Sequence, residues 1–327
     1  MTKAGLRALR RRLLTPKSSE ATLEVRGFHH KNEASKELLE SIGRNFLFGF
    51  ATAVEARAPA EAERLLDTVP PQFRGFAYEG AGMGFATLDA LPFGGGGRVA
   101  EFLAGAGGKH VYMVYVGVGW AMARVPRFRW PKLAVGDELL QWLLMDGYGF
   151  HQAYFHTEKY VHRHYREPDF PWPFSGPAWY ANRAIDQGIG RALWFVGGAD
   201  AAQVAELIDG FPDTRRADLY AGAGLAATYA GGAGPEELRW FAEHSGRHRA
   251  VVAQGSAFAA EARALAGLTV DHTHVATDIL CGTGADEAAH RVRALKPAGP
   301  GRDDVPAYEL WRRGFADQYV HSGGVEQ

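Results

Sequence analysis

Glu79, Asp146 and His151 are the residues whose side chains could carry acid–base chemistry in this chain. Glu79 lies in the glycine-rich segment 78–84, whereas Asp146 and His151 lie together in segment 146–151. A carboxylate that is buried among apolar groups has a raised pKa and can exchange a proton near neutral pH. We therefore assign Glu79, Asp146 and His151 as candidate catalytic residues.

The aromatic neighbours of these residues are candidate substrate-binding groups, namely Tyr78, Tyr148 and Phe150. The glycines of the same segments cost roughly 1 kcal/mol each inside a helix, so a compensating role is expected. Two roles stay open: the glycines let neighbouring helices cross closely, or they leave room for a ligand beside Glu79 and Tyr148. Helix crossing is the simpler explanation, because the second half of the chain keeps glycines at 222, 224, 282 and 284.

Helix geometry limits which of the three candidates can act together. Asp146 and His151 are five residues apart, so on one helix their side chains point about 140° apart. They can face one small pocket only if the helix unwinds at a glycine between them. We expect Glu79 with either one of them, rather than all three, to form the site beside a cavity.

The spacing of the ligating residues does not indicate a metal site. His151 and His162 share a helical face but lie about 16 Å apart, which is too far for one metal ion. Glu158 and His162 are neighbours, yet no paired Glu-x-x-His motif supplies further ligands. Because no common cofactor or hydrolase motif occurs either, we assign no metal and leave any cofactor unknown.

The chain also contains an internal repeat, in which five short blocks return in the same order. The offset between the blocks shrinks gradually, which indicates a tandem duplication with small deletions. The matched blocks are Ile42-Gly43-Arg44 with Ile189-Gly190-Arg191, Leu65-Leu66-Asp67 with Leu207-Ile208-Asp209, 78–83 with 220–225, Gly108-Lys109-His110 with Gly246-Arg247-His248, and 146–149 with 281–284.

The repeat separates structural positions from specialised ones. Arg44 and Arg191 match, and we interpret such shared residues as structural. The three candidate catalytic residues, in contrast, are specific to the first copy. At the positions that match Glu79, Asp146 and His151, the second copy has Ala221, Cys281 and Asp286.

Helical periodicity and proline positions predict an all-α fold with two pseudo-symmetric halves, each a helical bundle built from the repeated unit. The predicted regions are a basic helix and linker (1–31), a first repeat (32–164), a proline- and aromatic-rich connector (165–178), a second repeat (179–296) and a C-terminal segment (297–327). The connector is expected to cross the seam between the repeats, because its aromatic side chains need cover. The longest helix of the first copy is expected over 137–164.

Residues 3–14 predict a short basic amphipathic helix, with four leucines at helical spacing among arginines. Docking on the protein's own core is the simpler expectation for this helix. Association with an anionic surface or a partner is the alternative.

Composition excludes several classes of protein. The formal net charge of −1 provides no basic field for nucleic acid. The single cysteine, Cys281, excludes an intrachain disulfide and favours a reducing, cytoplasmic location. The longest charge-free apolar run, 111–123, has about 13 residues, fewer than the roughly 18 that span a bilayer, so no membrane span is expected. The oligomeric state is not indicated.

Four motifs carry a resemblance: Phe76-Ala77-Tyr78-Glu79-Gly80-Ala81-Gly82-Met83-Gly84, Trp130-Pro131-Lys132-Leu133, the segment 146–152, and Asp186-Gln187-Gly188-Ile189-Gly190-Arg191. Together they resemble a family of unknown function that is encoded beside enediyne polyketide synthases. The resemblance extends over nearly the whole chain. It implies a role in making or handling an enediyne polyketide core, but it implies no mechanism.

Two functional hypotheses follow. In the first, the protein binds and processes an apolar polyene intermediate in a cavity lined mainly by the first copy. In the second, it is a non-catalytic protein that shields the polyene or assembles other pathway proteins. The absence of a cofactor motif favours the second hypothesis.

Overall fold

The computed structural model describes residues 3–92, 95–299, 301 and 304–321, and all regular structure within these ranges is helical. The expected all-α fold class is confirmed. The α-helices are α1 (Lys3–Leu14), α2 (Leu23–Arg26), α3 (Glu33–Glu55), α4 (Pro59–Leu66), α5 (Pro71–Ala90), α6 (Arg98–Ala104), α7 (Val111–Met122), α8 (Trp142–Phe155), α9 (Ala181–Val196), α10 (Ala201–Asp209), α11 (Asp213–Ala230), α12 (Pro235–His244), α13 (Arg249–Leu265), α14 (Asp271–Leu280), α15 (Ala285–Ala294) and α16 (Ala307–His321).

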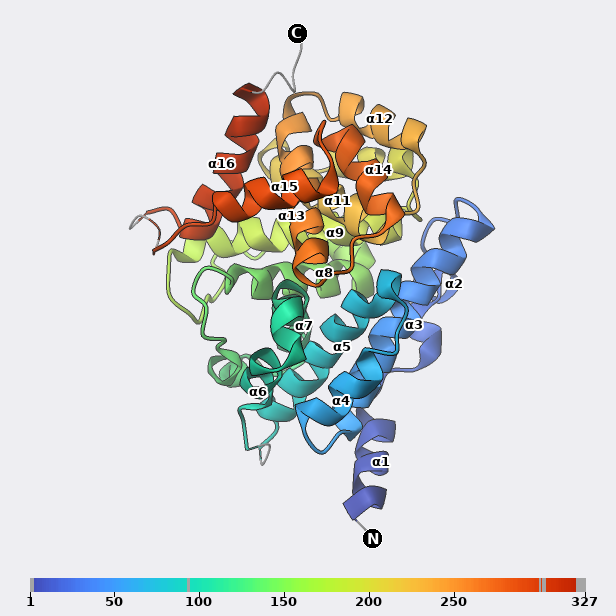
Figure 1. The fold of residues 1–327 in the computed structure, drawn as a ribbon, viewed down its shortest axis with the longest axis vertical. Coiled ribbons are helices and arrows are strands. Elements are labelled where there is room, and N and C mark those ends of the chain that lie inside the picture. Colours follow the sequence, from blue (N-terminus) through green and yellow to red (C-terminus); the bar gives the residue numbers. More distant parts are fainter. Residues whose placement is uncertain (1–2, 93–94, 300, 302–303, 322–327) are drawn as a thin grey trace.

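The long helices pack side by side in the order α3, α5, α7, α8, α9, α11, α13 and α15. Figure 1 shows this stack running from the N-terminal half at the bottom to the C-terminal half at the top. Shorter helices such as α4, α6, α10 and α12 connect successive members of the stack. The core is therefore continuous from one half of the chain to the other.

Pairs of glycines two residues apart determine this packing. Two residues correspond to about 200° around a helix, so the two glycines face opposite neighbours. In α5, Gly80 meets the backbone of α3 and Gly82 meets the backbone of α7. A Cβ atom at Gly117 of α7 would in turn overlap the carbonyl oxygen of Glu79 in α5. In the other crossings too, a glycine of each helix meets the backbone of its neighbour; the pairs are Gly119 and Gly147, Gly149 and Gly188, Gly190 and Gly222, and Gly224 and Gly255.

Close helix crossing therefore accounts for the glycines at 80, 82, 147, 149, 222 and 224. Gly282 and Gly284 differ, because they lie in the turn between α14 and α15 and a Cβ at either would meet nothing within 4 Å. Their sequence counterparts, Gly147 and Gly149, lie inside α8.

The two halves share one order of elements. In the first half, α3, α4, α5, α6, the 3-10 turn η2 (Ala106–His110) and α7 follow one another. In the second half, α9, α10, α11, α12, the 3-10 turn η6 (Gly246–His248) and α13 do so. The hydroxyl of Tyr78 donates to Asp67 at 2.8 Å, and that of Tyr220 donates to Asp209 at 2.9 Å. The order differs afterwards, because the first half ends with one more helix (α8), whereas α14, α15 and the C-terminal α16 follow α13.

The helix expected over 137–164 is shorter than the sequence suggested. It begins at Trp142, because Asp137 accepts hydrogen bonds from the backbone N–H groups of Leu139 and Leu140 and holds the preceding residues in turns. It ends at Phe155, and a π-helical turn over Glu158–His162 follows.

The connector packs through its aromatic rings. Phe170 lies against Trp130 and Tyr148, with ring centroids 5.7 Å and 5.3 Å away. Trp172 stacks on Trp142 at 4.4 Å. The connector thus covers α8, the last helix of the first half. The C-terminal segment forms α16, and its residues 300, 302–303 and 322–327 lie outside the described ranges.

The N-terminal helix α1 docks through an arginine rather than through its leucines. Arg10 donates hydrogen bonds to the carbonyl oxygens of Val54 and Ala56 at the end of α3, the second at 3.2 Å. Among the leucines, Leu14 packs on the core, whereas Leu6, Leu9 and Leu13 are exposed. Figure 1 shows α1 projecting from the N-terminal end of the stack.

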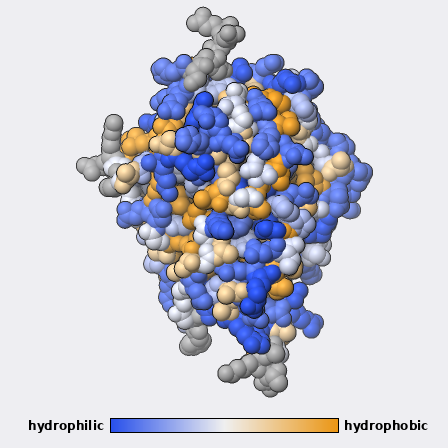
Figure 2. Space-filling model, in the orientation of Figure 1, coloured by the Kyte–Doolittle hydropathy of each residue, from blue (hydrophilic) through white to orange (hydrophobic). Residues whose placement is uncertain are grey.

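Polar and apolar side chains are interspersed over the face shown in Figure 2. Within the described residues, no helix combines the length and the apolar character needed to cross a membrane.

Candidate functional site

The first cavity lies in the N-terminal half, between helices α3, α5, α7, α8 and α9. Its empty volume is about 670 Å³, including its mouth. Carbon atoms make up most of its wall, and the 16–21 segment borders it. The lining residues are Pro16, Glu20, Ala21, Ile42, Gly43, Phe46, Leu47, Phe50, Phe76, Glu79, Met83, Trp120, Arg124, Phe150, Tyr154, Phe155, Arg191 and Phe195.

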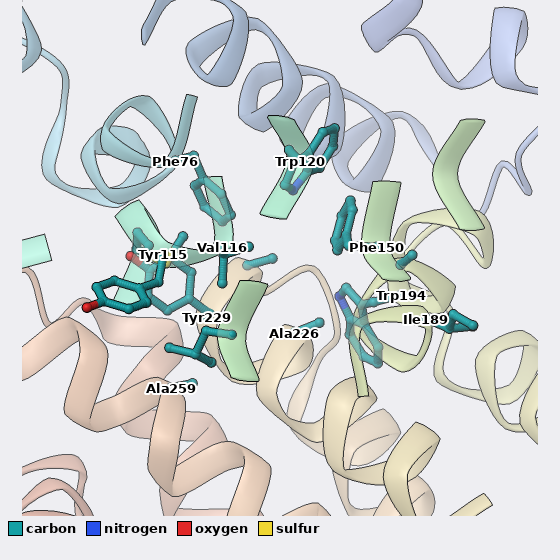
Figure 3. Packing of buried hydrophobic residues seen from close by; sticks show 14 of the residues in the cluster. Phe76, Tyr115, Val116, Trp120, Phe150, Ile189, Trp194, Ala226, Tyr229 and Ala259 are labelled. Carbon is teal, nitrogen blue, oxygen red and sulfur yellow. The ribbon is translucent and has the colours of Figure 1, made fainter. Parts of the chain in front are cut away.

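Aromatic rings form a connected wall along this cavity. The ring of Trp120 lies 4.5 Å from that of Phe46 and 5.0 Å from that of Phe150. Phe150 also contacts Phe195 at 5.3 Å. Figure 3 shows Trp120 and Phe150 next to one another in the core, with Phe76 on the other side of Trp120. Such a wall suits a flat or extended apolar ligand.

Four charged side chains line the cavity, Glu20, Glu79, Arg124 and Arg191, and of these Glu79 and Arg191 are buried. Arg191 of α9 donates a hydrogen bond to the carboxylate of Asp146 in α8. Its Nη2 lies 3.8 Å from an oxygen of Glu79 in α5, which is too far for a hydrogen bond. All three side chains are at most 7% exposed. They come together because the glycine contacts bring α5, α7, α8 and α9 into one narrow stack.

The two carboxylates have different surroundings. Asp146 also accepts a hydrogen bond from the Gln187 amide at 2.8 Å, so two donors stabilise its charge. Burial raises the pKa of Glu79 to about 7; the nearby Arg191 lowers it, and the charge of Asp146 raises it further. Glu79 can therefore donate or accept a proton near neutral pH.

A second cavity, whose empty space including its open mouth is about 520 Å³, lies on the C-terminal side of Arg191. Asp146 and Arg191 line it together with apolar residues that include Val116, Tyr229 and Ala259 (Figure 3). Glu261 also lines it, and burial raises the pKa of this carboxyl to about 7 despite Arg293 at 3.1 Å. Arg191 thus borders both cavities, with Glu79 in the first and Asp146 in the second.

Among the candidates named from the sequence, Glu79 and Phe150 line the first cavity. The guanidinium of Arg191 lies 5.2 Å from the centre of the Phe150 ring. Asp146 reaches the same arginine from the side of the second cavity. The structure therefore brings Glu79 and Asp146 to one cation, although they line different cavities.

His151, Tyr78 and Tyr148 are absent from the linings of both cavities. His151 packs against Trp120 and Phe155, and burial lowers its pKa to about 3, so its ring is neutral. Tyr78 donates to Asp67 and stacks on His110 at 3.7 Å. Tyr148 accepts a hydrogen bond from Gln152 and packs against Phe170. The helical angle of about 140° separates Asp146 from His151 as expected.

Sequence reasoning missed Arg191 and Trp120. Arg191 was interpreted as structural because it matches Arg44, yet Arg44 is half-exposed and pairs with Glu37 on the surface. Glu79 could have indicated the role of Arg191. It is specific to the first copy, and a carboxylate that is buried requires a nearby cation or a proton. The tryptophan carried no comparable signal, since it lies in an apolar run.

These observations define an all-helical protein with two apolar cavities that meet at one buried arginine. The chain belongs to the family DUF1702, described as a protein of unknown function, which matches residues 5–319. No curated protein and no solved structure matches the chain.

Proposed function

We propose that the protein binds an apolar polyene or polyketide intermediate of enediyne biosynthesis in the first cavity and processes it. The observation that carries this proposal is the aromatic wall of the cavity beside Glu79 and Arg191. A conjugated chain is flat and apolar, so it stacks favourably on such rings. The resemblance of the motifs to the enediyne-associated family supports this choice of ligand.

The processing step that these residues support is proton transfer by Glu79. A conjugated polyene gains a proton at one carbon and loses another elsewhere when its double bonds are rearranged, without any oxidant or reductant. The carboxyl of Glu79, with a pKa of about 7, can both give and take that proton. Arg191 lies beside this carboxyl, with its Nη2 at 3.8 Å.

The alternative is a non-catalytic protein that shields the polyene or assembles other pathway proteins in the cytoplasm. The mainly carbon lining of the first cavity favours it, because shielding needs no reacting group. The internal repeat is compatible with both proposals. We infer that the two halves descend from one duplicated unit, on the basis of their shared element order and equivalent Tyr–Asp hydrogen bonds.

One experiment separates these proposals. Purified protein is incubated with the polyene, and the absorbance and mass of the polyene are followed in the presence of wild-type protein and of the Glu79→Gln variant. If the protein processes the polyene, the absorbance of the polyene should change with the wild type and stay unchanged with the Glu79→Gln variant. Tight binding with an unchanged polyene would support the shielding protein, and absence of binding would contradict both.

A further inference from the structure

We infer that the ligand of the first cavity is an apolar carboxylic acid, whose carboxylate binds Arg191 in place of the charge of Glu79. This inference rests on the proposed function, in that it names the chemical class of the molecule bound in the same cavity. Its polar end would lie between Arg191, Glu79 and Trp120, and its hydrocarbon chain along the aromatic wall.

The first argument is that Arg191 has unused hydrogen-bond donors. A guanidinium carries five N–H donors. Among the described residues, Asp146 is the one acceptor within hydrogen-bond distance of this guanidinium, and it is reached through Nη1 alone. The nitrogens Nε and Nη2 remain available, and Nη2 is the one nearer to Glu79.

A second buried arginine, Arg215, provides an internal comparison. Its Nε and Nη2 donate to the carboxylate of Asp186, and its Nη1 donates to the carbonyl oxygen of His164 at 2.7 Å. All three nitrogens of this structural arginine are therefore occupied by protein. Among the described residues, Arg191 has Asp146 as its one such partner and borders a cavity, which is the arrangement expected of an arginine that receives an anionic ligand.

The second argument is an unpartnered donor in the cavity wall. Trp120 is 6% exposed, and its indole nitrogen has no hydrogen-bond partner in the described part of the chain. A buried N–H without a partner is costly, so such groups in native proteins indicate a missing acceptor. The indole points toward Glu79 without meeting ordinary hydrogen-bond geometry, and a hydrogen bond between the two would lower the pKa of that carboxyl, so the indole faces the same polar region as Arg191.

The third argument concerns the balance of charge. Arg191 and Asp146 form a neutral pair, and Glu79 adds either one negative charge or none. If Glu79 takes up a proton when the ligand carboxylate enters, the charge of the buried site is unchanged. Binding then needs no additional buried charge, which would be costly.

The groups that face Glu79 come from four helices. They are Arg191 from α9, Asp146 from α8, Trp120 from α7 and the buried phenol of Tyr229 from α11. Helix α3 contributes the apolar rings of Phe46 and Phe50. In this set, Glu79 is the group whose pKa burial raises to about 7.

The test uses cis-parinaric acid, a fluorescent conjugated tetraene acid, together with its uncharged methyl ester. Binding of both is measured by fluorescence titration of the full chain between pH 6 and pH 8. We expect the wild type to bind the acid roughly tenfold more tightly than the ester at pH 6, as for a charge-assisted hydrogen bond. This preference should fall as pH rises, because Glu79 ionises and competes for Arg191. In the Glu79→Gln variant the preference should persist at pH 8.

A second variant tests whether Arg191 causes the preference for the acid over the ester. Arg191→Gln combined with Asp146→Asn removes both charges of the pair, and at pH 6 the buried Glu79 keeps its proton, so the site carries no charge. It should bind acid and ester equally. If the wild type binds acid and ester equally at all pH values, the inference that the ligand is a carboxylic acid is overturned. The proposal that the first cavity binds an apolar ligand is then retained. If neither probe binds, the proposed function fails as well.

Discussion

Arg191 donates a hydrogen bond to Asp146, which lies 45 residues earlier in the chain, and both side chains are buried. The pair joins α8 to α9, the two helices at which the halves of the protein meet. Its position gives it two roles: it stabilises the junction, and it places a cation on the wall of the first cavity. The predictions below separate these roles.

Asp146→Ala should strongly destabilise the protein, because it leaves the charge of Arg191 buried without a partner. Removing one member of a buried ion pair costs about 3–5 kcal/mol. The measurement is the free energy of unfolding in urea. The matched control is Glu158→Ala, which breaks the exposed Arg163–Glu158 pair and should change stability little. Equal effects of the two substitutions would contradict a structural role for Asp146.

Glu79 should make stability depend on pH. Its pKa is raised from 4.5 to about 7 in the folded protein, so between these values the unfolded chain releases the proton first. Stability should therefore fall as pH rises from 4.5 to 7, by about 3 kcal/mol for this group. Glu261 adds a contribution of the same sign through its own raised pKa.

Urea unfolding at pH 5 and pH 8 measures this dependence. Glu79→Gln should reduce the loss of stability between the two pH values, and the double variant with Glu261→Gln should reduce it further. A Glu79→Gln protein with the full wild-type dependence on pH would show that this carboxyl titrates normally in the fold.

Gly117→Ala should destabilise the stack, because the added Cβ would overlap the carbonyl oxygen of Glu79 and separate α5 from α7. Overpacking of this kind costs about 1–3 kcal/mol. Gly136→Ala is the control, since a Cβ there would meet nothing within 4 Å. Thermal unfolding of both variants provides the comparison, and an unaffected Gly117→Ala protein would refute the close crossing.

The glycines show how far the sequence could predict the fold. Their i, i+2 spacing inside apolar helices indicated close crossings, and the periodic segments indicated an all-helical chain. The order of the stack was not predictable, because which helix faces each glycine depends on contacts between segments far apart in sequence. The boundaries of α8 were also missed, since the turn held by Asp137 has no strong sequence signal.

The candidate site was predictable only in part. Glu79 was identified because the second copy has alanine at the matching position, and Phe150 because it is an aromatic neighbour of the other candidates. Arg191 was not identified, because it matches Arg44 in the repeat and both were interpreted as structural. In the structure Arg191 is buried, whereas Arg44 is half-exposed. His151 shares a helix with Asp146, but its side chain points to a different surface of that helix.

The most direct test of the central claim is whether blocking the first cavity abolishes binding of an apolar ligand. Met83 lines the first cavity and Met113 lines the second, so Met83→Trp and Met113→Trp fill one cavity each. The ligand is the methyl ester of cis-parinaric acid, followed by fluorescence titration, with circular dichroism to show that both variants are folded. We predict that Met83→Trp abolishes binding of the ester and that Met113→Trp binds it as the wild type does. If Met83→Trp still binds the ester and Met113→Trp does not, the assignment of the ligand to the first cavity is contradicted.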